Sequence, residues 1–294
     1  MRISAPPFWA STAGTRRPWA WGSPPSSAPL GKVRNAVLTA AHRRLIFGPV
    51  SRHLDDVRSS MGLLRQGRDM VDTFVTPFLY LQDTVESFEY PRSDLPGQVH
   101  FIGPLLSPDR ALPEQPDWWD EATSGRPVVL VTQGTVTNLD DHLIGATIEA
   151  LAGSDPLVIV AGADRSLRLP EPRPSNVRIE SYVPMAALMP HVTAFVTNGG
   201  YGGVQRALAQ GVPIVVAAGS EDKPEVAARI AWSGTGVRLS QRPSAAEVRR
   251  AIESLDVDPR YRANARRVAN DMASHRPAHE GADSSSSSAG HTAP

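Results

Sequence analysis

Glycine-rich residues that follow an apolar run are the part of this chain best suited to hold an anion. The segment VTNGGYGGVQRAL (196–208) places four glycines within five residues, ahead of a segment with helical spacing. Glycine lets main-chain N–H groups approach a ligand closely, and a helix N-terminus adds partial positive charge. The pattern therefore favours a phosphate group as ligand, although a tight strand-to-helix turn has the same signature.

Two further apolar runs end in polar residues. Gly134 and Thr135 follow one of them, and Asp222 and Lys223 stand between another and a helical segment. Taken alone, Asp222 is better explained as ordinary charge at a helix N-terminus. None of these loops has the G-x-G-x-x-G or G-K-[ST] pattern of dinucleotide and nucleoside-triphosphate sites. Together, the three loops offer partners for phosphates and hydroxyls.

The elements that must position these loops alternate along the second half of the chain. This alternation predicts a doubly wound, Rossmann-like α/β domain whose parallel sheet is covered on both faces. Ligands of such sheets bind beyond the carboxyl ends of the strands, where the three loops lie. The predicted strands are 127–134, 157–162, 177–183, 193–198 and 213–219, and the predicted helices are 138–151, 203–210, 224–233 and 244–254.

Composition and spacing divide the chain into five segments. The two ends are low in periodicity and rich in Pro, Ser or Gly, which predicts disorder. The second segment has helical spacing as far as Leu64, with a break at Gly48-Pro49, followed by short strands at 73–76, 78–82 and 99–104. The segments are a disordered start (1–30), part of an N-terminal α/β domain (31–105), a proline-containing linker (106–126), the sheet domain (127–273) and a disordered tail (274–294).

The overall composition excludes several classes of function. Lys and Arg total 30, as do Asp and Glu, so no net field attracts nucleic acid. The chain has no cysteine, which excludes disulfides and Cys-type metal sites and suits a cytoplasmic location. No apolar run approaches the roughly 18 residues of a membrane-spanning helix. The one D-x-D pattern, Asp256 to Asp258, precedes a proline and is interpreted as a turn, so no metal site is predicted.

The order of these motifs resembles the donor half of GT-B glycosyltransferases, and most closely the UDP-glucuronosyl/macrolide-type family (glycosyltransferase family 1) in its actinobacterial form. The resemblance covers roughly residues 70 to 270. It implies a GT-B fold whose C-terminal domain holds a UDP- or dTDP-linked sugar in an interdomain cleft, with no further cofactor and no metal. The matching segments are FLYLQDTVESFEYPRSDLPGQVHFIGPLL, the GT pair at 134–135, SYVPMAALMPH, TNGGYGGVQRALAQGVPIVV and SEDKPEVAARIAWSGTGVRL.

The resemblance also implies roles for individual residues. Val183 and Met185 would line the pocket for the nucleotide base. Asn198 stands where many members have a His that donates to the diphosphate. Asp222 and Lys223 fall on an acid–amide pair that binds sugar hydroxyls. The residues that would hold the diphosphate and sugar are Gly134, Thr135, Asn198, Gly199, Gly200, Gly202, Gly203, Asp222 and Lys223.

The implied reaction transfers a hexosyl group, with inversion, to a hydroxyl of a small lipophilic acceptor. The family's usual base is a His with an Asp partner, in an N-terminal segment without a counterpart here. We therefore assign no catalytic residue, and each of the eight histidines is expected to be structural or exposed. The chain is expected to be a member truncated at its N-terminus. Two alternatives stay open: a sugar-nucleotide-binding fragment or partner subunit without transfer, and a GT-B-fold sugar-nucleotide epimerase.

Overall fold

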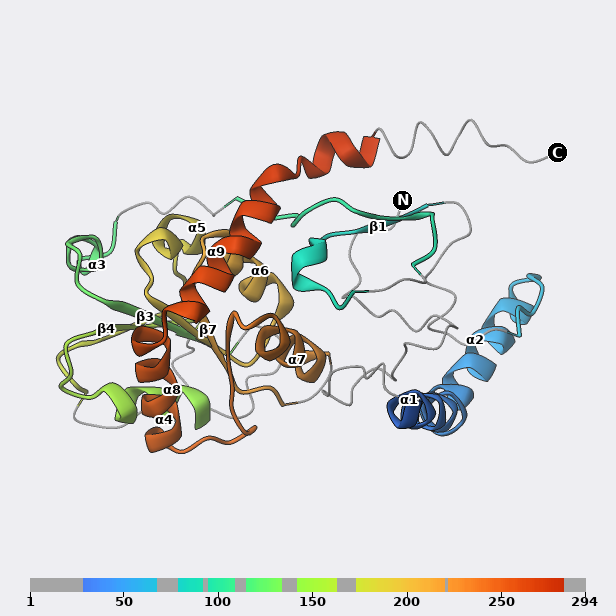
Figure 1. Ribbon diagram of the computed structural model, residues 1–294, viewed down its shortest axis with the longest axis horizontal. Coiled ribbons are helices and arrows are strands. Elements are labelled where there is room, and N and C mark those ends of the chain that lie inside the picture. The colour runs from blue at the N-terminus through green and yellow to red at the C-terminus, as the bar shows by residue number, and fades with distance from the viewer. Residues whose placement is uncertain are drawn as a thin grey trace.

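A six-stranded parallel sheet forms the centre of the molecule (Figure 1). The computed structural model describes residues 29–67, 79–91, 95–108, 115–133, 142–162, 173–219 and 222–282. The strand order is β5-β4-β3-β6-β7-β8, and every neighbouring pair is parallel. This confirms the predicted doubly wound sheet. The strands are β3 (Val128–Thr132), β4 (Leu157–Ala161), β5 (Val177–Glu180), β6 (Ala194–Thr197), β7 (Ile214–Val216) and β8 (Gly236–Arg238).

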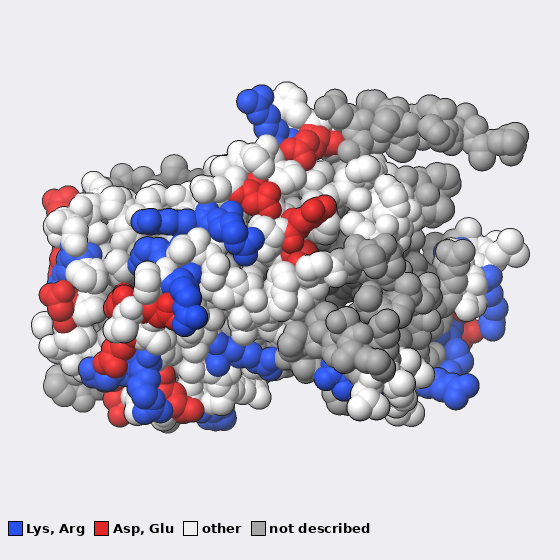
Figure 2. Space-filling model, in the orientation of Figure 1, with Lys and Arg blue, Asp and Glu red and all other residues white. Residues whose placement is uncertain are grey.

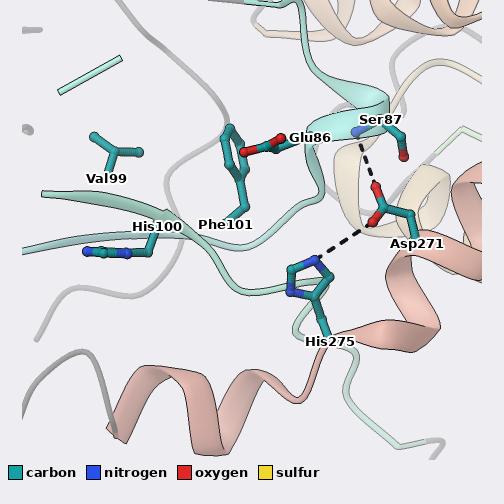
Figure 3. A pocket seen from close by; sticks show the side chains of 7 residues that line it. All are labelled: Glu86, Ser87, Val99, His100, Phe101, Asp271 and His275. Atoms are coloured by element: carbon teal, nitrogen blue, oxygen red, sulfur yellow. Dashed lines mark hydrogen bonds and ion pairs between the residues drawn. The ribbon is translucent and has the colours of Figure 1, made fainter. Parts of the chain in front are cut away.

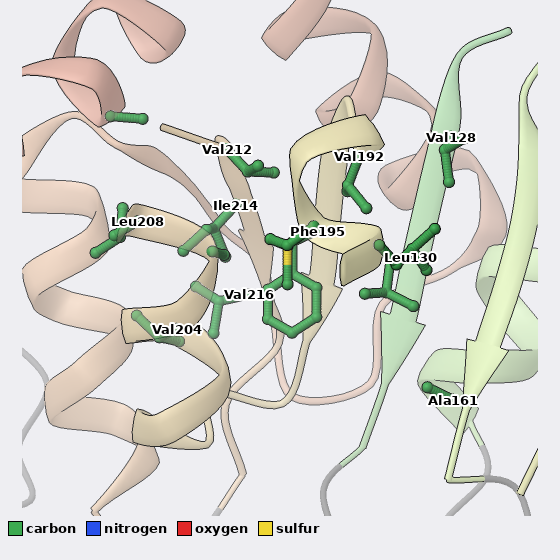
Figure 4. Packing of buried hydrophobic residues seen from close by; sticks show 14 of the residues in the cluster. Val128, Leu130, Ala161, Val192, Phe195, Val204, Leu208, Val212, Ile214 and Val216 are labelled. Carbon is green, nitrogen blue, oxygen red and sulfur yellow. The ribbon is translucent and has the colours of Figure 1, made fainter. Parts of the chain in front are cut away.

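The central strands are apolar along their whole length because both of their faces are buried. In β3, Val128 and Leu130 belong to one core cluster, while Val129 and Val131 belong to the other. Successive side chains of a strand point to opposite faces, so each strand supplies both cores. Figure 4 shows the first cluster, in which Phe195 lies among side chains of β3, β7 and the helix that follows β6.

Two groups of helices cover the two faces of the sheet (Figure 1). On the first face, α6 packs against α9 and α7 lies beside them. On the second face, α4 packs against α8. The helices of the first face are α5 (Met185–Leu188), α6 (Tyr201–Ala209), α7 (Lys223–Ser233) and α9 (Pro259–Ser274); those of the second are α4 (His142–Leu151) and α8 (Ala245–Val257).

The strand order reverses between β3 and β6. From β3 the chain proceeds to β4 and β5 on one side, and from β6 it proceeds to β7 and β8 on the other. In doubly wound sheets, the carboxyl edge at such a reversal is the crevice in which ligands bind, and residues 198–203 follow β6 at this edge.

The N-terminal part contains two helices and a small parallel sheet. The helix α1 (Pro29–His42) continues through the π-helical turn η1 (Arg43–Phe47) into α2 (Gly48–Ser60), so the predicted break at Gly48-Pro49 falls where α2 starts. The strands β1 (Tyr80–Gln82) and β2 (Val99–Phe101) pair with each other, and the 3-10 turn η3 (Glu86–Phe88) follows β1. Residues 1–28 and the predicted strand 73–76 lie outside the described residues.

The structure corrects the predicted boundaries at four places. The strand β8 has no apolar run that would predict it. The helix α6 starts at Tyr201 rather than at 203, although its first turn contains two glycines of low helix propensity. The predicted linker includes α3 (Trp119–Thr123), beside which Trp118 is buried and donates from Nε1 to Glu180 Oε1 at 2.6 Å. Residues 277–282 form a further helix, where a disordered tail was predicted.

Basic and acidic side chains are interspersed over the face of the sheet domain seen in Figure 2. Among the described residues, no helix is both long enough and apolar enough to cross a membrane.

Candidate functional site

The glycine loop, residues 198–203, lies at the carboxyl edge of the sheet between β6 and α6. Gly199 has a φ of +96°, and a Cβ placed on it would lie 3.3 Å from the Lys223 Cβ, the Lys223 carbonyl oxygen and the Val216 Cγ2. A side chain fits neither this backbone conformation nor this space. Glycine at position 199 therefore allows the loop after β6 to touch the start of α7.

Asn198 joins the glycine loop to the end of β3. Its Nδ2 donates a hydrogen bond to the main-chain oxygen of Gln133, while its Oδ1 is buried without a hydrogen-bond partner among the described residues. Thr132 and Thr197 are paired in the sheet, so Gln133 and Asn198 are the first residues beyond the two strands that border the crevice. The Gly199 N–H donates to the Thr197 Oγ1 at 3.2 Å, which fixes the turn between them.

The first turn of α6 presents main-chain donors at this edge. The N–H groups of the first helical residues have no carbonyl partner within their own helix, whereas the Val204 N–H donates to the Gly200 oxygen at 3.1 Å. Gly202 is exposed, and a Cβ on it would meet nothing within 4 Å. A Cβ on Gly203 would lie 3.3 Å from the Phe195 Cζ, so Gly203 faces the core rather than the crevice. Its N–H remains part of the helix terminus.

A second helix N-terminus meets the glycine loop. Asp222 is the N-cap residue of α7 and Lys223 is its first residue, and both side chains are half-buried. The Gly199–Lys223 contact brings the positive ends of α6 and α7 to one place. The structure thus collects Asn198, the four glycines, Asp222 and Lys223 at one edge.

The other predicted site residues differ in their positions. Val183 is only 4% exposed and packs in the core, whereas Met185, at the start of α5, is half-buried and packs against the same cluster. Of the two residues expected at the nucleotide base, Met185 is therefore the one that can reach a ligand. Gly134 and Thr135 lie outside the described residues.

Sequence reasoning missed a buried polar network beside the glycine loop. The Arg229 Nε donates to the Glu89 Oε2 at 2.8 Å, and the side chains of both residues are 6% exposed. The neighbouring Gln205 donates from Nε2 to the main-chain oxygen of Asp83. The one sequence signal for this network was Arg229 within the apolar segment VAARIAW (226–232). A charged residue at a core position requires a buried partner.

The electrostatics of this network follow from its burial. Burial raises the pKa of the Asp83 carboxyl to about 6, against its hydrogen bond to the main chain. Burial, and then the charge of Glu89, raises the pKa of the Tyr201 phenol well above its usual range. Although burial opposes it, Glu89 and Glu225 raise the pKa of Arg229, which stays charged.

A cavity of about 630 Å³ lies where α9 meets η3 and β2 (Figure 3). His275, at the end of α9, stands between two carboxylates: its Nε2 is 3.9 Å from Asp271 Oδ1 and its Nδ1 is 2.8 Å from Glu280 Oε2. Asp271 also accepts a hydrogen bond from the Ser87 N–H at 3.2 Å. This arrangement fastens the end of α9 to Ser87 and Gly103.

The other histidines whose side chains are described are either bonded to the main chain or exposed. The Nε2 of His142 pairs with the Pro243 carbonyl oxygen at 2.9 Å. The exposed ones are His53, His100, His191 and His279. Within the described ranges, no group of three or more His, Asp or Glu side chains is arranged to hold a metal ion.

The sequence of the chain is similar to those of known proteins. Residues 145–284 match the family described as "Erythromycin biosynthesis protein CIII-like, C-terminal domain". The chain is 47% identical over 281 residues to 4'-demethylrebeccamycin synthase of Lentzea aerocolonigenes, an alignment that covers 92% of this chain and 66% of that protein. The chain belongs to glycosyltransferase family 1.

Further relatives of this family 1 chain agree with the assignment. UDP-glycosyltransferase 2 of Phaeomoniella chlamydospora is 37% identical over 83% of the chain. The crystal structure of CalG4, described as the calicheamicin glycosyltransferase, superposes over 83% of this chain and 62% of CalG4, with a TM-score of 0.65 and 26% identity. The chain spans 66% and 56% of the length of the first two relatives. The GT-B fold expected from the motifs is confirmed.

Proposed function

We propose that this chain carries the donor half of a glycosyltransferase that moves a hexosyl group from a nucleotide-diphospho-sugar to a hydroxyl of a small-molecule acceptor. The observation that carries the proposal is the contact of Gly199 with Lys223, which joins two helix N-termini at the reversal of strand order. Two positive helix ends at one crevice suit a diphosphate with a sugar attached to it.

Each group at this edge has a part in the proposed reaction. The N–H groups of Tyr201, Gly202 and Gly203 bind the diphosphate, and Asp222 and Lys223 contact the sugar hydroxyls. The acceptor oxygen attacks the anomeric carbon as the bond to the diphosphate oxygen breaks, which inverts the configuration, and the acceptor proton passes to a base. The helix ends and the Lys223 ammonium stabilise the charge on the leaving diphosphate, so that the proposed reaction needs no metal.

The names of the relatives support the acceptor class. One relative is a 4'-demethylrebeccamycin synthase and one structural neighbour is a calicheamicin glycosyltransferase. Both names refer to small molecules, so we extend a small, lipophilic acceptor to this chain as part of the proposal.

A second candidate function is donor binding without transfer. It is favoured because we assign no base among the described residues: His142 bonds to a carbonyl oxygen, His275 to Glu280, and His53, His100, His191 and His279 are exposed. Incubation with UDP-glucose and a panel of phenolic acceptors separates the two candidates. Release of UDP that depends on the acceptor supports transfer, and nucleotide binding without such release supports the second candidate.

Calorimetric titration with UDP and with dTDP tests the donor site itself. We expect one of the two nucleotides to bind, and Gly202→Glu to weaken that binding by about tenfold or more, because a carboxylate would face the diphosphate. Val257→Glu adds the same charge at the exposed end of α8, on the opposite edge of the sheet, and should leave the affinity unchanged. Absence of heat with both nucleotides would overturn the proposal.

A further inference from the structure

Most of the buried polar residues that the structure describes gather at one internal interface. Between residues 82–89 on one side and helices α6 and α7 on the other, seven polar or charged residues are at most 7% exposed. Buried polar groups are costly unless they are paired, so this concentration requires a structural or functional reason. The seven are Gln82, Asp83, Thr84, Glu89, Gln205, Glu225 and Arg229.

The first attachment between the two sides is made by α6. Tyr201 and Gln205 are four residues apart and so lie on the same face of that helix. The Gln205 amide donates to the main-chain oxygen of Asp83, whereas the Tyr201 hydroxyl oxygen is buried without a hydrogen-bond partner among the described residues. Tyr201 is the first residue of α6, adjacent to the glycine loop.

The second attachment is made by α7. The Arg229 guanidinium is held on one side by Glu89 at 2.8 Å, and on the other by the main-chain oxygen of Glu225 at 3.1 Å and its Oε2 at 3.4 Å. Its Cζ also lies 5.1 Å from the centre of the Tyr90 ring, which packs edge-on against Trp232. Glu225 belongs to the first turn of α7, two residues after Lys223.

These attachments form a closed ring of contacts. From Glu89 the ring passes through Arg229 and the first turn of α7 to Lys223, crosses the contact with Gly199 into α6, and returns from Gln205 to Asp83, which precedes Glu89 in the same segment. A closed ring fixes the spacing of the helix ends in a way that either attachment alone does not. The side chains of Gln205, Arg229 and Glu89 are separate from the groups that would touch the ligand, whereas Lys223 and the loop belong to both.

We infer that Gln205 and Arg229 are positioning residues, through which residues 83–90 hold the N-termini of α6 and α7 at the spacing that a diphosphate-sugar requires. The inference rests on the proposed function and adds a part of the donor site that lies before the sheet domain in sequence. Because Glu89 precedes that domain, the N-terminal segment shapes donor binding without touching the donor.

Hydrogen exchange of the nucleotide-free chain tests the ring directly. Gln205→Met removes the amide donor and keeps the length of the side chain, and Glu89→Gln removes one charge. In both variants we expect the amides of residues 199–204 to exchange about fivefold faster or more, because the local opening of the loop becomes easier. The matched control is Thr235→Val, which deletes a fully buried hydroxyl just past the other end of α7. It should lower the melting temperature without changing exchange at residues 199–204.

Titration with the nucleotide that binds the native chain provides the second readout. Gln205→Met should raise the dissociation constant about fivefold or more, while Thr235→Val should leave it unchanged. Lower melting temperatures with unaltered exchange at residues 199–204 would overturn the inference, because the network would then be only structural. If Gln205→Met fails to fold, Glu89→Gln takes its place. Absence of nucleotide binding by the native chain defeats the proposed function, whereas the exchange result still decides the inference.

Discussion

The side-chain amide of Asn198 donates a hydrogen bond to the main-chain oxygen of Gln133, and this bond joins the two strands between which the sheet order reverses. One hydrogen of the amide is therefore committed to the protein rather than to a ligand. Asn198 thus fixes the ends of β3 and β6 relative to each other. Its second amide hydrogen is available for a contact with a diphosphate.

Replacing Asn198 by Ala removes this bond. We expect a loss of about 1 kcal/mol in the free energy of unfolding, the usual worth of one hydrogen bond. Nucleotide affinity should fall as well, because the loop after β6 is no longer tied to β3. Urea unfolding and calorimetric titration measure the two effects.

Thr193→Val is the matched control for Asn198→Ala. The Thr193 Oγ1 donates to the Val128 oxygen at 2.9 Å, and so joins the same two strands at their amino ends. Its loss should lower stability by a similar amount of about 1 kcal/mol and leave nucleotide affinity unchanged. Equal affinities for both variants and the native chain would show that Asn198 has no role in the site.

The glycines of the loop should respond differently to alanine. Gly199→Ala forces a side chain into a left-handed conformation and against Lys223, which should cost about 2 kcal/mol or more. Gly202→Ala places its methyl group in open space on a helix, where it should stabilise the chain by about 0.5 kcal/mol. Thermal unfolding of the two variants gives the comparison, and equal melting temperatures would contradict the geometry.

Asp83 should make stability depend on pH. Burial raises the pKa of its carboxyl to about 6 from an ordinary value of 3.8, so between these values the folded state binds more protons than the unfolded state. The free energy of unfolding should therefore fall, on the order of 1 kcal/mol after solvent screening, as the pH rises from about 4 to about 6. Unfolding by urea at several pH values measures this slope. Asp83→Asn should remove this pH dependence of stability. Glu86→Gln changes a nearby exposed carboxylate and should leave the pH dependence unchanged.

Residues 275–282 should contribute to stability. His275 lies between Asp271 and Glu280, and its Cβ packs so closely on Gly103 that a Cβ there would lie 2.5 Å away. Ending the chain after Ser274 should lower the free energy of unfolding by about 1 kcal/mol, as expected for partly exposed ion pairs. Ending it after Ala282 keeps these contacts and should leave the melting temperature as it is. A tail that acts only as coil would make the two truncations equivalent.

The sequence by itself determined the architecture of the sheet domain. Runs of β-branched residues predict strands that are buried on both faces. The helical spacing between these runs predicts a parallel sheet with the glycine loop at its carboxyl edge. These signals are local, since a strand and the turn after it are encoded by consecutive residues. The positions of Asn198, Gly199 and Lys223 at one edge follow from this order alone.

Tertiary structure decided what local signals do not contain. The partner of Arg229 is Glu89, which lies 140 residues earlier, and no spacing within α7 points to it. The same holds for β8, which becomes a strand because β7 offers it hydrogen bonds, and for Val183, which packs in the core beside the site. Burial and pairing depend on which distant segments the fold brings together, and for that reason the network around Glu89 is visible only in the folded chain.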